Sequence, residues 1–141
     1  MYKTMEEPMT IRRIQFIIVN SVLLLFFGLA ISASADSMKI AVATTGPEKT
    51  AAISQQAARS PFFLFFDGKG NFLEAMENPS KDLPGGAGQS TASLIAKKGA
   101  TLIIAGNIGH KMKEALREYQ IEYIKKTGVA YDVVQTIIQN R

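Results

Sequence analysis

The sequence of 141 residues contains no cysteine and only one histidine. The absence of cysteine excludes disulfides, thiolate metal ligands, cysteine-held iron–sulfur clusters and cysteine nucleophiles. The chain also lacks a Walker loop and a GxGxxG motif, so it carries no specific signature of nucleotide binding. Its lysines are spread along the whole length and the net charge is only +4, so we predict no nucleic-acid partner.

What is present is typical of one small domain behind an apolar leader. Hydrophobic residues make up 47% of the chain and charged residues 20%, as in a globular protein. An almost uncharged apolar run covers residues 14–31, basic residues precede it, and Ala33-Ser34-Ala35 follows it. Because these are the three regions of a secretory signal, we assign residues 1–35 to a signal peptide or N-terminal membrane anchor and residues 36–141 to the domain.

Three interpretations of the leader stay open. Small side chains at Ala33 and Ala35 suit cleavage before Asp36. The apolar run would cover roughly 27 Å as a helix, nearly the thickness of a bilayer core, so an uncleaved leader helix would be a membrane anchor. Alternatively, Met38 is the true start. In the first two cases the preceding positive charge keeps the N-terminus inside, and the domain is expected in the periplasm or another extracytoplasmic location.

Apolar runs and turn residues predict the order strand, hairpin, helix, strand, helix, strand, helix. Strand-helix-strand units imply parallel strands with right-handed crossovers, and the early hairpin adds antiparallel strands. We therefore predict an α/β domain with a mixed five-stranded sheet and about three helices, with the first strand at the centre. The strands are expected at residues 39–43, 62–67, 71–77, 101–105 and 121–124, and the helices at 89–98, after Gly109, and near the C-terminus.

The apolar side chains give finer expectations for three elements. Four phenylalanines between residues 62 and 66 are expected to pack in the core. The third strand does not alternate perfectly, which suggests a bulge. The helix after Gly109 is expected to bury a face with helical spacing that consists of Met112, Ala115, Leu116 and Tyr119.

Two glycine-containing loops precede the first two helices, with Gly86 and Gly88 in one loop and Gly106, Asn107 and Gly109 in the other. Free backbone N–H groups and the helix dipole attract anions at such positions. Two converging helix starts would form an anion site without a charged side chain. The alternative is that the glycines only permit tight strand-to-helix turns.

His110 directly follows Gly109 at the start of a helix. In an α/β fold this lies at the edge of the sheet where ligands bind, so His110 is a candidate metal ligand. The alternative is a surface or capping histidine. No elbow motif for a serine hydrolase and no cluster of carboxylates for a metal-dependent nuclease is evident, so we do not expect an enzyme.

Four segments in order resemble the dinitrogenase iron-molybdenum cofactor biosynthesis family, the nitrogenase cofactor carrier and insertion proteins. They are residues 38–44 (MKIAVAT), Ser54 with 59–63 (RSPFF), 86–88 (GAG) and 104–109 (IAGNIG). The resemblance covers about residues 38–139. It implies a ribonuclease-H-like three-layer fold and the binding of an iron–molybdenum cofactor or an iron–sulfur precursor by loops at one end of the sheet.

From this resemblance, Arg59 is expected to bind an acidic group of the ligand. The whole predicted site comprises Arg59, Gly86, Gly88, Gly106, Asn107, Gly109 and His110. The resemblance and the leader together suggest an exported carrier or sensor that binds an anionic metal cluster or small ligand. The family commonly has histidines near positions 55–58 and 84–86, where this chain has none. The alternative function is therefore a module that binds a protein partner and has lost its ligand site.

Overall fold

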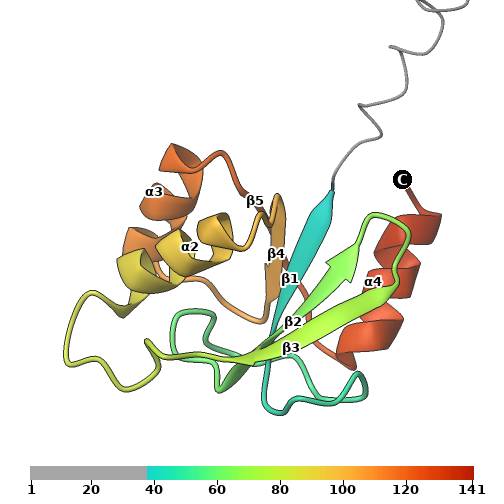
Figure 1. Ribbon diagram of the computed structural model, residues 1–141, viewed down its shortest axis with the longest axis horizontal. Helices are drawn as coiled ribbons and strands as arrows, with labels where there is room; N and C mark the ends of the chain where they lie inside the picture. Colours follow the sequence, from blue (N-terminus) through green and yellow to red (C-terminus); the bar gives the residue numbers. More distant parts are fainter. Residues whose placement is uncertain (1–37) are drawn as a thin grey trace, which may run out of the picture. The chain divides into compact units, whose positions relative to one another are not determined.

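The computed structural model describes residues 38–141, which are coloured in Figure 1. The predicted leader, including its interpretation as a helix, lies outside these residues. Within them, no helix combines the length and the apolar composition that crossing a membrane requires.

The first strand lies at the centre of a five-stranded sheet with the order β3-β2-β1-β4-β5, as predicted. Strand β1 (Lys39–Thr44) pairs antiparallel with β2 (Phe62–Asp67) and parallel with β4 (Leu102–Ala105). This strand is buried from Ile40 onward, because neighbouring strands cover both of its edges and helices cover both faces of the sheet. Its short, mainly apolar sequence fits this position.

The hairpin of β2 and β3 (Phe72–Glu77) contains the expected bulge, because the register shifts between Phe65 and Phe66. Its turn is fixed by Asp67, whose Oδ1 accepts hydrogen bonds from the backbone N–H groups of Lys69 and Asn71 at 2.9 Å. The bulge lets Phe66 meet Phe72, with ring centroids 5.7 Å apart, in an edge-to-face arrangement.

Two crossovers complete the sheet. Helix α2 (Ala87–Lys97) connects the hairpin to β4, and α3 (His110–Glu118) connects β4 to β5 (Glu122–Lys125), which pairs parallel with β4. Helix α4 (Ala130–Gln139) follows. The mixed five-stranded sheet and the three helices within residues 38–141 confirm the predicted α/β architecture.

The helices form layers on both faces of the sheet (Figure 1). Helices α2 and α3 cover the face that carries Ala41, Phe63 and Ile103. Helix α4 covers the opposite face, where Val42 and Leu64 pack. Successive residues of a strand thus pack into the cores on opposite faces of the sheet, because their side chains point alternately to the two faces.

Three local predictions need correction. Helix α2 begins at Ala87, earlier than Gln89, because Gly86 with φ 72° turns the chain directly into it. Strand β5 is shifted by one residue from the predicted range. Tyr119 does not belong to the buried face of α3: it is the C-cap residue and 47% exposed, since the helix ends at Glu118.

Candidate functional site

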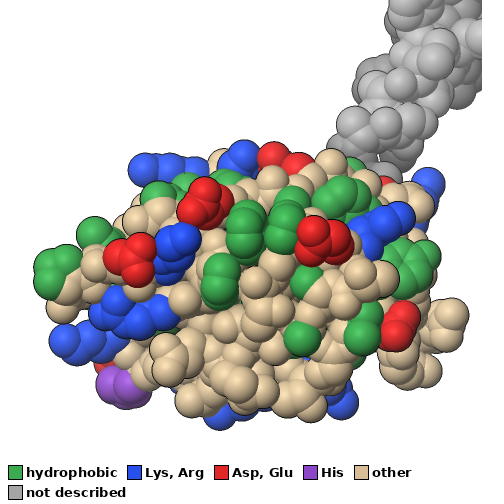
Figure 2. Space-filling view, turned by 90° about the horizontal axis from the view of Figure 1, so that it is seen from below, with side chains coloured by type: hydrophobic (Ala, Val, Ile, Leu, Met, Phe, Trp, Pro, Cys, Tyr) green, Lys and Arg blue, Asp and Glu red, His purple; other side chains and the backbone are tan. Residues whose placement is uncertain are grey.

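The three predicted loops gather at one end of the sheet, and backbone hydrogen bonds join two of them, residues 45–60 and 106–110. We call residues 45–60, 84–90 and 106–110 the loop rim. After β1, Ser54 donates its N–H to Ala43 and accepts one from Gly106 at 2.9 Å. Ala57 donates to the carbonyl oxygen of Asn107 at 3.1 Å. Figure 2 views the molecule from below and shows a broad tan area of uncharged polar side chains and backbone at this end.

The first turns of α2 and α3 touch beside the loop rim, where Gly88 meets Met112. A Cβ added to Gly88 would lie 3.1 Å from the backbone nitrogen of Met112, so the two helix starts approach closely. Neither helix has a side-chain cap, and neither has an acidic residue in its first turn. The positive ends of two helix dipoles therefore lie side by side without a negative side chain from their own first turns.

The four predicted glycines of the loop rim differ in whether the structure requires a glycine at that position. Gly86 adopts a positive φ, and Gly88 permits the helix contact. Gly106 faces Gln55, whose Cα would be 3.0 Å from an added Cβ. An added Cβ on Gly109 would meet only open space. The tight-turn or close-packing explanation thus accounts for three of the four predicted glycines, and Gly109 is the one of these four without a local constraint.

Arg59 connects two parts of this end of the molecule. Its Nη1 donates hydrogen bonds to the carbonyl oxygens of Lys81 and Leu83, both at 2.9 Å. The side chain is exposed, and Nε and Nη2 form no hydrogen bond with residues 38–141. Arg59 therefore fixes the loop before α2 and keeps further hydrogen-bond donors for a ligand. Its binding role stays a prediction.

His110 lies at the start of α3, and its side chain is 84% exposed. Its Nε2 is 3.1 Å from Oε1 of Glu114, one helical turn along. The imidazole is therefore accessible to solvent and to a ligand, beside the carboxylate of Glu114. Asn107 is also exposed, and its carbonyl oxygen already accepts the bond from Ala57.

The donor atoms of the loop rim suit an anion better than a bare metal ion. Among residues 38–141, no three His, Asp or Glu side chains are grouped so that they could hold a metal. One exposed imidazole cannot supply the several ligands that protein-bound metal ions use. Unpaired backbone N–H groups in the first turns of two helices can instead hold the outer atoms of a negatively charged ligand.

A buried polar network, which the sequence analysis missed, holds the loop rim in place. The carbonyl oxygen of Ala58 accepts hydrogen bonds from Asn78 Nδ2 and Thr91 Oγ1, both at 3.0 Å. Ser80 and Ser90 are joined through their hydroxyls at 2.7 Å. Polar residues in a mainly apolar helix, such as Thr91, were the available signal.

Two cavities lie away from the predicted site residues. One, of about 330 Å³, lies between α3 and β5, and another, of about 270 Å³, is lined in part by Met38, Gln120 and Arg141. Neither is lined by any of the seven predicted residues. The loop rim is therefore a surface rather than one of these cavities.

Comparisons with known proteins agree with the fold. The apo form of the orange protein from Desulfovibrio gigas is 25% identical, with a TM-score of 0.69 over 76% of this chain and 92% of that protein. A NifB-like protein of the DUF35 family from Thermotoga is 24% identical, with a TM-score of 0.63 over 74% of this chain and 90% of that one. No curated protein matches the chain significantly. Residues 38–140 match the family described as dinitrogenase iron-molybdenum cofactor. The chain therefore belongs to the dinitrogenase iron-molybdenum cofactor family.

Proposed function

We propose that this protein is a non-enzymatic carrier or sensor that binds an anionic metal-containing cofactor at the loop rim. The observation that carries the proposal is the contact between two uncapped helix starts, Gly88 against Met112. The family description, which names the iron-molybdenum cofactor, supports a cluster of iron–molybdenum or iron–sulfur type as the ligand.

The chemistry of such binding follows from the groups at the rim. Backbone N–H groups are fixed donors, so they lose little conformational freedom when they bind sulfide or oxide atoms of a cluster. The imidazole of His110 can add a single bond to a metal, and Arg59 can add a positive charge. The protein would hold and present the ligand without transforming it.

We further propose that the domain acts outside the cytoplasm and that its three-layer fold is of the ribonuclease-H-like type. The support for export is the signal-like sequence of residues 1–35. Fractionation of cells followed by N-terminal sequencing tests it. A mature chain beginning at Asp36 in an extracytoplasmic fraction is expected for cleavage, and a chain beginning at Met38 in the cytoplasm would contradict export.

Reconstitution with metal tests the binding proposal. The full chain, kept in a nonionic detergent because of its apolar residues 14–31, is incubated without oxygen with ferrous iron, sulfide and molybdate, and is then desalted. We expect a visible absorption band and bound metal that elute with the protein. The double variant His110→Ala/Arg59→Ala should lose most of both.

The matched control is Lys97→Ala, which removes a positive charge from the last turn of α2, at the other end of that helix. It should bind as the wild type does, and circular dichroism should show that all variants are folded. If the wild type binds no metal, or if the double variant binds as much as the control, the loop rim is not the cofactor site.

An alternative function is a module that binds a protein partner, and one observation favours it. Strand β3 is an edge strand, and Phe72 and Leu73 on it are 36% and 48% exposed. Exposed apolar side chains beside an unpaired strand edge suit association. In this case the immobilised wild type would retain a protein partner, and the variant Leu73→Lys would not. The mixture of iron, sulfide and molybdate would leave the melting temperature of the domain unchanged.

A further inference from the structure

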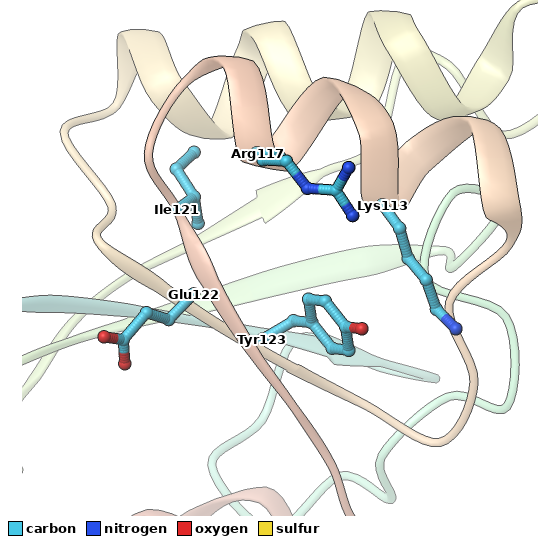
Figure 3. A pocket seen from close by; sticks show the side chains of 5 residues that line it. All are labelled: Lys113, Arg117, Ile121, Glu122 and Tyr123. Carbon is cyan, nitrogen blue, oxygen red and sulfur yellow. The ribbon is translucent and has the colours of Figure 1, made fainter.

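The cavity between α3 and β5 has a positive lining. Lys113 and Arg117 project from α3, and Ile121, Glu122 and Tyr123 line it from the chain that enters β5. Figure 3 shows the guanidinium of Arg117 extending along the helix toward Lys113, with the ring of Tyr123 below Arg117 and beside the end of the Lys113 side chain. The cavity lies at the edge of the sheet, since β5 is a terminal strand.

The two cations of this cleft have no carboxylate partner within residues 38–141. Neither Lys113 nor Arg117 forms an ion pair within 4.0 Å, although four of the five ion pairs in this part of the chain join a lysine or arginine to a glutamate. Glu122, the one acidic residue of the lining, lies 3.5 Å from Arg141, and Figure 3 shows its carboxylate directed away from the two cations.

The positions of the cations are set by the fold. Lys113 and Arg117 are four residues apart, so they lie on one face of α3 and repel each other. The Nζ of Lys113 is 5.6 Å from the ring centroid of Tyr123, and this contact holds the ammonium over the cleft. An anion between the two groups would relieve their repulsion and would accept hydrogen bonds from both.

The remaining lining is apolar. Ile121 is buried, and Tyr123 is 43% exposed, so its ring forms an accessible wall beside the cations. A volume of about 330 Å³ exceeds the space of a single small ion. The cleft therefore suits a molecule with a negatively charged end and a flat or apolar body.

We propose that the cleft between α3 and β5 binds a small ligand through a carboxylate or phosphate group, held by Lys113 and Arg117 with its body against Tyr123. This site is separate from the loop rim and does not depend on the function proposed there. Inorganic phosphate and acetate are the two simplest probes, and they show which oxyanion the pair of cations prefers.

The test uses the full chain in nonionic detergent with carbon-13 in its tyrosine rings. The protein has four tyrosines, so the spectrum is simple, and the variant Tyr123→Phe identifies the signal of Tyr123. We expect phosphate or acetate to shift this signal saturably, with Tyr131 as the internal reference. Sodium chloride at equal ionic strength should leave the signal in place.

The variant Lys113→Gln/Arg117→Gln should weaken binding of the better probe by about tenfold or more, because two charge-assisted hydrogen bonds are lost. The control Lys69→Gln/Lys97→Gln changes the net charge equally at two exposed lysines outside the cleft, and it should bind as the wild type does. Circular dichroism shows whether each variant is folded. Equal shifts of Tyr131 and Tyr123, no saturation with either probe, or equal weakening in both double variants would overturn the proposal.

Discussion

The loop rim and the cleft between α3 and β5 both favour negative charge, but they do so with different groups. The rim uses mainly uncharged backbone N–H groups of two touching helix starts, together with the side chains of Arg59 and His110, and is held by buried hydrogen bonds such as Thr91 to Ala58. The cleft uses full charges on long side chains, Lys113 and Arg117, which reach into an open cavity. The rim should therefore be rigid and little affected by salt, whereas the cleft should be adaptable and sensitive to salt.

The hairpin turn shows within the same molecule how amides stabilise a negative charge. Asp67 accepts N–H groups from Lys69 and Asn71, together with the side-chain amide of Asn71. These hydrogen bonds, the side chain of Asn71 first among them, hold the pKa of the Asp67 carboxyl below its ordinary value. The turn is an internal counterpart of what we propose for the loop rim and an external anion.

The largest effect is expected from Gly88→Ala, which tests the rigidity of the loop rim. Its new Cβ would lie 3.1 Å from the backbone nitrogen of Met112, so α2 and α3 would have to separate. Overpacking of this kind costs about 1–3 kcal/mol, partly offset by the better helix propensity of alanine. We expect the free energy of unfolding, measured by urea denaturation, to fall by about 1–2 kcal/mol.

Two other variants set the scale for this result. Gly85→Ala adds a methyl group where nothing lies within 4 Å, and Lys113→Gln changes the open cleft. Both should change the unfolding free energy by no more than about 0.5 kcal/mol. A Gly88→Ala protein as stable as these two would mean that the helix starts can move apart freely, and the contrast between rim and cleft would disappear.

A smaller effect is expected from Glu122→Gln, which sharpens the description of the cleft. Glu122 is the acidic residue of the lining, so its neutralisation should raise the affinity for phosphate by about twofold, the size typical of an exposed charge. The tyrosine signal described above measures this affinity. The control is Glu118→Gln, which changes the net charge equally from an exposed position outside the lining. An equal gain in both variants would point to the charge of the whole molecule instead.

The smallest effect is expected from Asp67→Asn at the hairpin turn. Because the pKa of Asp67 lies below the ordinary 3.8, its carboxylate stabilises the fold above that pH, and the contribution is lost as the pH falls through the folded pKa. The wild type should melt slightly above the variant at neutral pH, and the two should converge in acid. If the difference in melting temperature between the wild type and Asp67→Asn is the same at every pH, the charge of Asp67 does not contribute to stability.

Most of the fold could be predicted from the pattern of apolar residues and turns. Short apolar runs such as residues 39–44 and 102–105 have the composition of strands that are buried on both faces, and they are β1 and β4. The bulge near Phe65 was also predicted, because the alternation of the next strand fails. The end of α3 was not, since helical spacing continues through Tyr119 while Gln120 adopts a φ of 58°.

Less of the candidate site could be predicted. The sequence indicates which glycines precede helices, but it cannot distinguish a positive φ, as at Gly86, from a close contact, as at Gly88. It also cannot show that Lys113 and Arg117 border a cleft. Two cations four residues apart on a helix give the same sequence pattern whether solvent or the edge of a sheet lies beside them. In this structure Tyr123 of the edge strand β5 lies beside them.

Helix α4 follows all five strands in the sequence, and it supplies the helical cover for the sheet face that carries Val42, Leu64 and Phe66. It is also tied to the first hairpin, because Gln135 Nε2 donates a hydrogen bond to the carbonyl oxygen of Gly70 at 2.8 Å. On the ribosome, the opposite face can be covered as soon as α2 and α3 emerge, while this one stays bare until residues 130–139 are released. We therefore expect the nascent chain to be most prone to aggregation during that interval.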